Sequence, residues 1–298
     1  MATIRCGMHG LAGIRWLARL ALAVLLVPAL LSVAAARMKP PCTDCVLQGK
    51  KHPYGTFHVA LPPGWNGHSP MKLLIFLHGY GANGQDMVAD ADVGGVAAKL
   101  GFMLVAPDGR GTSWAGTGMP GAAAPDGGRD DVAFLHAVLR DVEKRWPIDR
   151  SMVVLGGFSI GGSMTWQIAC HAPRGFTAFL PMSGGFWLPM PAHCVAPVAL
   201  RHLHGSDDKV VPLAGRVMLR RFHMGDIDQG LGIFRATDRC TAPARAFSDP
   251  GHEHCTEWAG CAAGGAVEVC LHPGGHEMRG DWMTAGLHWA LAHPGRDK

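Results

Sequence analysis

The residues of this sequence best suited to chemistry form a short turn motif around Ser159. Residues 157–161 read Gly-Phe-Ser-Ile-Gly and directly follow the apolar run 152–155. In this G-x-S-x-G pattern, a serine between a strand and a helix lies on a sharp, strained turn that exposes its hydroxyl. The flanking glycines let neighbouring backbone approach closely, and the first N–H groups of the helix point toward whatever the hydroxyl attacks. We therefore predict that Ser159 is a nucleophile at a strand-to-helix turn.

Two further residues could activate this serine. A serine hydroxyl is a poor nucleophile until a base removes its proton, and the base is normally a histidine oriented by a buried carboxylate. Asp208 and His276 each come shortly after an apolar run, as Ser159 does. The sequence therefore predicts a triad of Ser159, Asp208 and His276, in the chain order serine, aspartate, histidine.

Neighbouring residues of the same types are alternatives for two of these roles. Asp207 and His272 lie one and four residues before the predicted carboxylate and base, respectively. Two other histidines, His78 and His204, each precede a glycine at the expected end of a strand. We interpret His78 and His204 as structural, because a His-Gly pair in this place closes a strand and needs the freedom of the glycine backbone.

The elements that must position these residues are alternating strands and helices. Apolar and alternating runs predict strands at 56–61, 73–77, 102–106, 152–155, 178–182, 198–203 and 267–271. Helical spacing predicts helices at 87–100, 131–146, 161–170 and 283–292. The first strand alternates like an edge strand, whereas continuous apolar strands are typical of a mostly parallel sheet with helices on both faces. Ligands bind at the carboxyl ends of such strands, where all three triad residues are expected.

Taken together, these motifs resemble the secreted α/β-hydrolases that include polyhydroxybutyrate depolymerases and feruloyl esterases. The resemblance covers most of residues 50–293. It is carried by Leu-His-Gly-Tyr-Gly at 77–81, Ala-Pro-Asp-Gly at 106–109, the Ser159 motif, His-Gly-Ser-Asp-Asp-Lys-Val-Val-Pro at 204–212 and Pro-Gly-Gly-His at 273–276. The family pattern H-G-x-x-D-x-x-V-P places the carboxylate on Asp208. The resemblance implies an α/β-hydrolase fold.

The resemblance also implies how the site is completed. It places the oxyanion hole on the backbone N–H groups of Tyr80 and Ile160. The chain departs from the family after His276, where an aromatic continuation common in relatives is replaced by Glu-Met-Arg-Gly-Asp-Trp. Trp114 and Trp187 are therefore candidate substrate-binding residues, with burial in the core as the alternative. No metal or organic cofactor is implied.

The function implied by the resemblance is that of a secreted serine esterase. Such an enzyme hydrolyses carboxylic esters through an acyl-enzyme, and 3-hydroxybutyrate-type polyester or its oligomers are the expected substrate. A feruloyl or acetyl-xylan-type ester of plant polysaccharide is the alternative. The non-enzymatic alternative is a secreted binding module on a hydrolase scaffold, which the presence of all three triad positions disfavours.

The N-terminal residues indicate export. Three arginines precede an apolar run at 20–33, and the small residues 34–36 follow it. This is the pattern of a signal peptide, here 1–36, and the run is shorter than the roughly 20 residues that a membrane-spanning helix needs. We therefore expect a secreted or periplasmic protein without stable membrane insertion. After the signal peptide we expect an irregular segment at 37–54 and a single catalytic domain at 55–298.

The cysteine count agrees with an oxidising compartment. The chain has nine cysteines, of which Cys6 falls in the signal peptide. An even number in an exported chain predicts up to four disulfides, worth about 2–4 kcal/mol each. We predict a Cys170–Cys194 bridge and a structural Cys42–Cys45 bridge. Two further pairs are expected among the last four cysteines, Cys240, Cys255, Cys261 and Cys270.

Charge and histidine content exclude other classes. The formal net charge is +4, and three of the positive charges belong to the signal peptide, so the mature chain is nearly neutral. Without a run of lysine or arginine there is no electrostatic case for binding nucleic acid. The sequence His252-Glu253-His254 has a spacing that can bind metal, but it stands in a cysteine-rich loop, and we predict no metal site.

Overall fold

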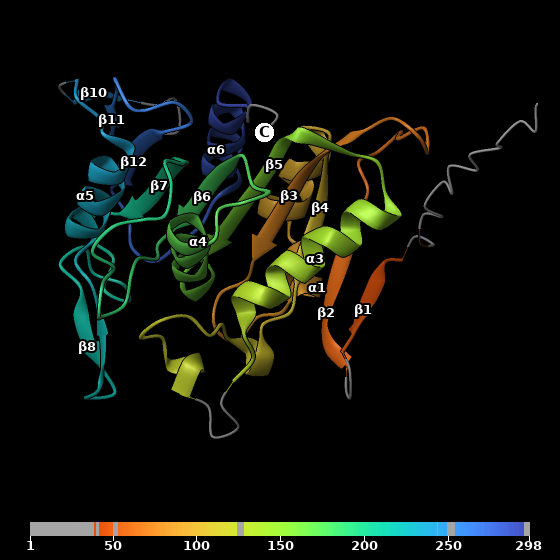
Figure 1. Cartoon of the computed structure of the whole chain (residues 1–298), viewed down its shortest axis with the longest axis horizontal. Coiled ribbons are helices and arrows are strands. Elements are labelled where there is room, and N and C mark those ends of the chain that lie inside the picture. Colours follow the sequence, from red (N-terminus) through yellow and green to blue (C-terminus); the bar gives the residue numbers. More distant parts are fainter. Residues whose placement is uncertain are drawn as a thin grey trace, which may run out of the picture. The chain divides into compact units, whose positions relative to one another are not determined.

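A ten-stranded mixed sheet forms the centre of the protein in the computed structural model (Figure 1). The structure describes residues 39, 42–49, 53–123, 128–242, 244–248 and 254–294, all within one compact unit, 38–298. The signal-peptide prediction, 1–36, lies outside the described residues. The strand order is β1-β2-β4-β3-β5-β6-β7-β12-β11-β10. The strands of this sheet are β1 (Asp44–Gln48), β2 (Pro53–Ala60), β3 (Met71–Leu77), β4 (Phe102–Pro107), β5 (Ile148–Phe158), β6 (Ala178–Met182), β7 (Ala199–Gly205), β10 (Arg245–Ser248), β11 (His254–Trp258) and β12 (Ala266–His272).

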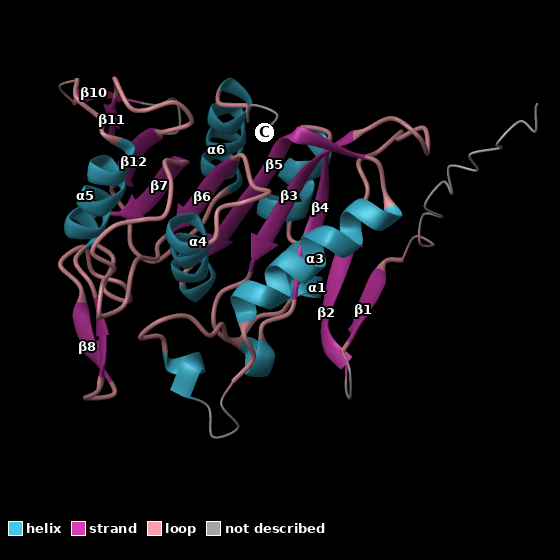
Figure 2. Cartoon of the chain, in the orientation of Figure 1, coloured by secondary structure: helices cyan, strands magenta, loops and turns pink. Residues whose placement is uncertain are grey.

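The middle of the sheet is parallel, as predicted. Strands β4, β3, β5, β6, β7 and β12 pair in parallel, and antiparallel pairs close the sheet at both edges. The helices between them lie on both sides of the sheet (Figure 2). They are α1 (Gly84–Ala89), α2 (Val96–Lys99), α3 (Asp131–Arg145), α4 (Ile160–His171), α5 (Ile227–Asp238) and α6 (Gly280–Ala292). The predicted α/β class is therefore confirmed.

The two faces of the sheet build two separate apolar cores. Successive side chains of a strand point to opposite faces. On β3, Leu73 and Ile75 accordingly join a core with α3, α4 and α5, whereas Leu74 and Phe76 join a core with α1, α2 and α6. Both faces of the central strands are thus buried, which explains why their sequences read as continuous apolar runs.

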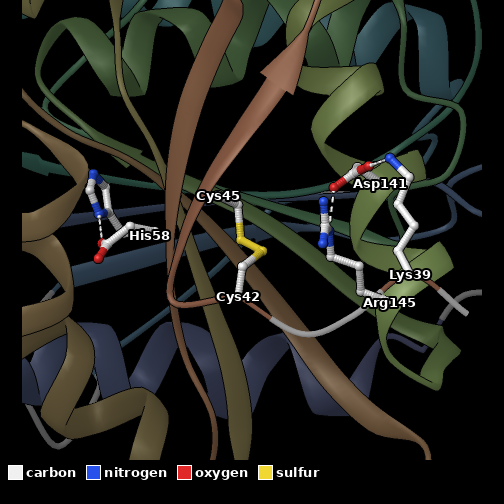
Figure 3. The surroundings of a disulfide bond; sticks show 7 residues. Lys39, Cys42, Cys45, His58, Asp141 and Arg145 are labelled. Carbon is white, nitrogen blue, oxygen red and sulfur yellow. Dashed lines mark hydrogen bonds and ion pairs between the residues drawn. A yellow bond between two sulfur atoms is a disulfide. The ribbon is translucent and has the colours of Figure 1, made fainter.

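The N-terminal part of the unit differs from the prediction. The segment 37–54, expected to be irregular, contains β1, so β2 pairs on both sides and is not an edge strand. Strand β1 escaped notice because only two of its five side chains, Cys45 and Leu47, are buried. The Cys42–Cys45 disulfide lies at its start, and nearby Asp141 on α3 holds both Lys39 and Arg145 (Figure 3).

Other differences are short elements and one divided helix. The expected helix at 87–100 is split at Asp90, whose side chain accepts hydrogen bonds from the N–H groups of Asp92 and Val93 and begins a separate π-helical turn. Helix α5 and strands β8 (Arg216–Met218), β9 (Phe222–Met224), β10 and β11 were not predicted. The four strands have three to five residues each, which is too short for a clear hydrophobic period.

The disulfides agree with the expected pairing. Cys170 on α4 is bonded to Cys194, and Cys42 to Cys45. The four later cysteines form the bridges Cys240–Cys261 and Cys255–Cys270, the second of which joins directly opposed residues of β11 and β12. Among the helices of the described ranges, none is long and apolar enough to cross a membrane.

Asp238 is a buried carboxyl at the end of α5. It is inaccessible to solvent; Oδ1 accepts a 3.3 Å hydrogen bond from the Val198 N–H, and Oδ2 has no hydrogen-bond partner among the described residues. This burial raises the pKa of Asp238 from 3.8 to about 7, because the charged form loses its hydration.

We expect Asp238→Asn to remove a pH-dependent loss of stability. The pKa of Asp238 is raised on folding, so the folded protein favours the protonated carboxyl. The contribution of Asp238 to the free energy of unfolding is therefore fully present below pH 3.8 and is lost as the pH rises through about 7. Between about pH 4 and pH 7, the wild type should lose on the order of 4 kcal/mol of unfolding free energy relative to the variant. Urea unfolding across this range measures the difference. The control is Asp228→Asn on the exposed side of α5, and parallel pH curves for wild type and Asp238→Asn would contradict the expectation.

Candidate active site

The turn between β5 and α4 holds Ser159 in a strained backbone conformation. Its φ and ψ are 58° and −121°, which a non-glycine residue rarely adopts, and its N–H donates to the Met182 carbonyl at 2.9 Å. The glycines on either side are required by space. A Cβ on Gly161 would collide with the Leu77 carbonyl, and a Cβ on Gly157 would collide with the Gly161 carbonyl. The sequence Gly-Phe-Ser-Ile-Gly therefore folds into a turn that requires glycine at both of these positions.

The structure brings Ser159, His276 and Asp208 together in one hydrogen-bonded line. His276 Nε2 lies 2.8 Å from Ser159 Oγ, and His276 Nδ1 lies 2.7 Å from Asp208 Oδ2. The other carboxylate oxygen of Asp208, Oδ1, accepts 2.8 Å hydrogen bonds from the N–H groups of Val210 and Val211. Because an ionised carboxylate only accepts, the ring proton of a neutral His276 is on Nδ1. Nε2 is then free to accept the serine proton.

The alternative residues lie away from this line. Asp207 is exposed and pairs with Lys209. His272 is buried at the end of β12, where it stacks on Trp282 with ring centroids 3.9 Å apart. Neither ring nitrogen of His272 has a hydrogen-bond partner in the described part of the chain, and burial lowers its pKa. The geometry therefore selects Asp208 and His276 over Asp207 and His272 as partners of the serine.

Two histidines interpreted as structural are indeed engaged with backbone groups. His78 Nδ1 donates to the Gly79 carbonyl at 2.7 Å, and its Nε2 accepts from the Gly109 N–H at 2.9 Å. His204 Nε2 donates to the Val211 carbonyl at 2.7 Å. Burial lowers the pKa of both rings. Neither contacts Ser159.

Comparison with known proteins agrees with this fold. A family model described as phospholipase/carboxylesterase matches residues 131–230, which contain the Ser159 turn and Asp208. A probable feruloyl esterase C of Aspergillus terreus is 26% identical over 274 residues, covering 88% of this chain and 90% of the relative. The corresponding protein of Aspergillus flavus is 32% identical over 169 residues, which span 54% of this chain and only 57% of the relative. The chain has the α/β-hydrolase fold and is similar in sequence to feruloyl esterases.

Solved structures of esterases share the fold of this α/β-hydrolase. The acetyl xylan esterase from Aspergillus awamori superposes with a TM-score of 0.56 at 12% identity, covering 83% of this chain and 100% of that chain. A thermostable esterase superposes with a TM-score of 0.54 at 16% identity, covering 84% of this chain and 62% of that chain.

The two backbone groups assigned to the oxyanion hole lie beside the serine of the hydrolase. Ile160 is the first residue of α4, and Tyr80 follows β3 in a loop that borders the serine, since a Cβ on Gly79 would lie 3.6 Å from the Ser159 Cβ. Within the described ranges, neither the Tyr80 nor the Ile160 N–H donates to another group of the chain. The Tyr80 side chain is 77% exposed.

The prediction that Trp114 and Trp187 bind substrate is corrected by the structure, in which both side chains are buried. Trp114 is completely buried and its indole N–H donates to the His78 carbonyl at 3.0 Å. Trp187 is also buried, and its N–H donates to Ser163 Oγ at 3.2 Å. Their loops fold back on the sheet and on α4, so both rings belong to the core and present no surface to a substrate.

The His-Glu-His sequence considered as a metal-binding motif is only partly described. His252 and Glu253 lie outside the described residues, and His254 is the first residue of β11.

Sequence reasoning missed two supports of the triad in this hydrolase. The Phe158 ring packs against the His276 ring with centroids 4.8 Å apart. The N–H groups of Val210 and Val211 hold Asp208, as described above. The spacing of these valines after Asp208 was part of the motif at 204–212, so an Asp-x-Val-Val turn was the available signal for the second support.

Proposed function

We propose that this α/β-hydrolase is a serine esterase with Ser159 as nucleophile, His276 as general base and Asp208 as the orienting carboxylate. The observation that carries the proposal is the continuous line from Ser159 Oγ through His276 to Asp208, with separations of 2.8 and 2.7 Å. These distances lie within the reach needed for proton transfer in the ground state.

The reaction follows from the position of each group. Ser159 Oγ attacks the ester carbonyl while its proton passes to His276 Nε2, and Asp208 stabilises the resulting imidazolium through Nδ1–H. The N–H groups of Tyr80 and Ile160 stabilise the oxyanion; one such donor is typically worth about 10²–10³ in rate. His276 then protonates the leaving alcohol. Water, activated by the same ring, releases the acid from the acyl-enzyme, so the mechanism requires no metal or organic cofactor.

The names of the relatives favour one substrate class. The relatives cited above are named feruloyl esterases, and one structural neighbour is named an acetyl xylan esterase. Within the proposed function we therefore favour esters of plant polysaccharides over the 3-hydroxybutyrate-type polyester first expected. The proposed setting is extracellular or periplasmic, which four disulfides and the pattern at 1–36 support.

Substrate choice is tested by direct competition. We expect kcat/KM on feruloylated arabinoxylan oligosaccharides to exceed that on 3-hydroxybutyrate oligomers by about 10²-fold or more, since an enzyme discriminates substrates by how differently it binds their transition states. Acetylated xylan oligomers and p-nitrophenyl acetate serve as comparison esters in the same assay. A preference for the hydroxybutyrate oligomers would overturn the polysaccharide assignment and restore the polyester one.

A further inference from the structure

Two buried histidines lie next to each other on β7, below the loop that carries Asp208. His202 and His204 are two residues apart on the strand, point to the same face and are inaccessible to solvent. His202 Nε2 lies 2.9 Å from His204 Nδ1. Trp166 Nε1 lies 3.2 Å from His202 Nδ1, and His204 Nε2 lies 2.7 Å from the Val211 carbonyl. Together these groups form an unbroken chain of hydrogen bonds from Trp166 to Val211.

Both ends of this chain impose the same direction on it. An indole N–H can only donate and a carbonyl oxygen can only accept, while a neutral imidazole has one donor and one acceptor nitrogen. Trp166 therefore donates to Nδ1 of His202, which places the His202 proton on Nε2. That proton is donated to Nδ1 of His204, which places the His204 proton on Nε2, facing the Val211 carbonyl. With respect to Trp166, the neighbouring ring and the Val211 carbonyl, each histidine then has a single tautomer that satisfies these partners.

This chain of hydrogen bonds connects the helix that follows Ser159 to the loop that carries Asp208. Trp166 lies on α4, seven residues after Ser159. At the other end, the Val211 residue whose carbonyl accepts from His204 also donates its N–H to Asp208 Oδ1 at 2.8 Å. The chain thus acts on the oxygen of Asp208 that does not face His276.

The same arrangement keeps the two rings uncharged. Burial lowers the pKa of His204 and lowers that of His202 well below 6.5. The titratable groups that act on His204 are Asp208 and the His202, His272 and His276 rings, and the Pro181 carbonyl interacts with His202. A proton on either acceptor nitrogen would set two donors against each other.

The uncharged state matters because His204 Nε2 is only 3.6 Å from Asp208 Oδ2, the oxygen that holds His276. A charged His204 would compete for that carboxylate, whereas a neutral one leaves its charge to His276.

We propose that His202 and His204 are positioning residues that register the Asp208 loop against the Ser159 helix through the chain Trp166–His202–His204–Val211. This inference rests on the proposed function for its kinetic readout. It assigns no contact with substrate to either histidine. Their effect is exerted through Val211 and the placement of Asp208 opposite His276.

The first experiment compares two substitutions of His204. His204→Phe keeps the ring volume but removes the donor to Val211 and the acceptor for His202. We expect kcat on p-nitrophenyl acetate to fall about 10²-fold with KM within about twofold, because misplacing a catalytic group by about 1 Å has a cost of this size. His204→Gln can still donate to the Val211 carbonyl and should recover kcat to within about tenfold of wild type.

A matched control separates positioning from general stability. His136 on α3 donates to the Ala172 carbonyl at 3.0 Å, past the end of α4 opposite Ser159. His136→Phe removes a comparable hydrogen bond and should lower the melting temperature without changing kcat. An equal loss of kcat in both phenylalanine variants, or a His204→Phe enzyme with wild-type kcat, would overturn the proposal.

A spectroscopic readout keeps the test independent of turnover. The His276 Nδ1–H bound to Asp208 should give a downfield proton resonance in wild type that is shifted or lost in His204→Phe and retained in His136→Phe. The proposed function fails if the wild type does not hydrolyse esters, or if its hydrolysis persists in Ser159→Ala. In that case the resonance alone tests whether His202 and His204 position Asp208. If His204→Phe does not fold, His202→Phe takes its place, since it removes both the acceptor for Trp166 and the donor to His204. An unchanged resonance and kcat in both His204→Phe and His202→Phe would refute the relay.

Discussion

Ser159→Ala is expected to lower kcat for ester hydrolysis by about 10⁶-fold while leaving the fold intact. The alanine removes the only atom proposed to attack the ester, and His276 then has no hydroxyl within reach, since its Nε2 is bonded to Ser159 Oγ at 2.8 Å. The backbone at this position is already held at φ 58° by the surrounding contacts, and alanine adds no atom to the turn. The measurement is kcat on p-nitrophenyl acetate and on a feruloylated oligosaccharide, with circular dichroism to check folding.

The control for this variant is a serine at the other end of the same strand. Ser151 lies in β5 and its side chain donates to Asp149, so Ser151→Ala should keep full activity. A serine-reactive fluorophosphonate should label wild type and Ser151→Ala but not Ser159→Ala. Labelling or hydrolysis that survives in Ser159→Ala would show that another residue is the nucleophile. No labelling in wild type would favour the non-enzymatic binding module.

Asp208→Asn is expected to lower kcat by about 10⁴-fold. Asp208 Oδ2 accepts the Nδ1 proton of His276, and Oδ1 accepts from Val210 and Val211, so the oxygen held by these amides is kept in an asparagine and its NH₂ group faces His276. The ring must then turn its bare nitrogen toward the amide and carry its proton on Nε2, where it cannot accept the serine proton. Steady-state kinetics on p-nitrophenyl acetate measure the loss.

Asp207→Asn provides the matched comparison one residue away. Asp207 is exposed and its side chain pairs with Lys209, so its substitution should change kcat by less than about twofold. The two variants remove the same charge in adjacent residues, but only Asp208 is buried and contacts His276. The reverse result, a large loss in Asp207→Asn and none in Asp208→Asn, would move the carboxylate by one residue.

The sequence predicted the strands that are buried on both faces. The buried parts of such strands, 73–77 in β3 and 152–155 in β5, are covered by helices on each side and are apolar at every position, which is visible without coordinates. Elements with few buried residues were missed. β1 buries two side chains, and β8 has no fully buried residue, so their periodicity carries little information.

At the site, positions set by local motifs were predicted from the sequence, whereas long-range contacts were not. The placement of Ser159, Asp208 and His276 after strands could be predicted because parallel strands end at one edge of the sheet. Trp114 and Trp187 were wrongly expected to bind substrate because both tryptophans also follow strands. Both rings are buried, and their indole N–H groups donate to the His78 carbonyl and to Ser163 Oγ, long-range contacts that the position after a strand does not predict.

By itself, the sequence determined the fold class and the Ser159 turn, because glycine spacing and apolar runs act on neighbouring residues along the chain. Only the tertiary structure decided which of these side chains meet: Asp208 bonds to His276, whereas Asp207 pairs with Lys209 and His272 stacks on Trp282. It also decided the histidine chain on β7, whose direction is set by Trp166 and Val211. These contacts join parts of the chain that come together only when the sheet forms, which is why no local pattern contains them.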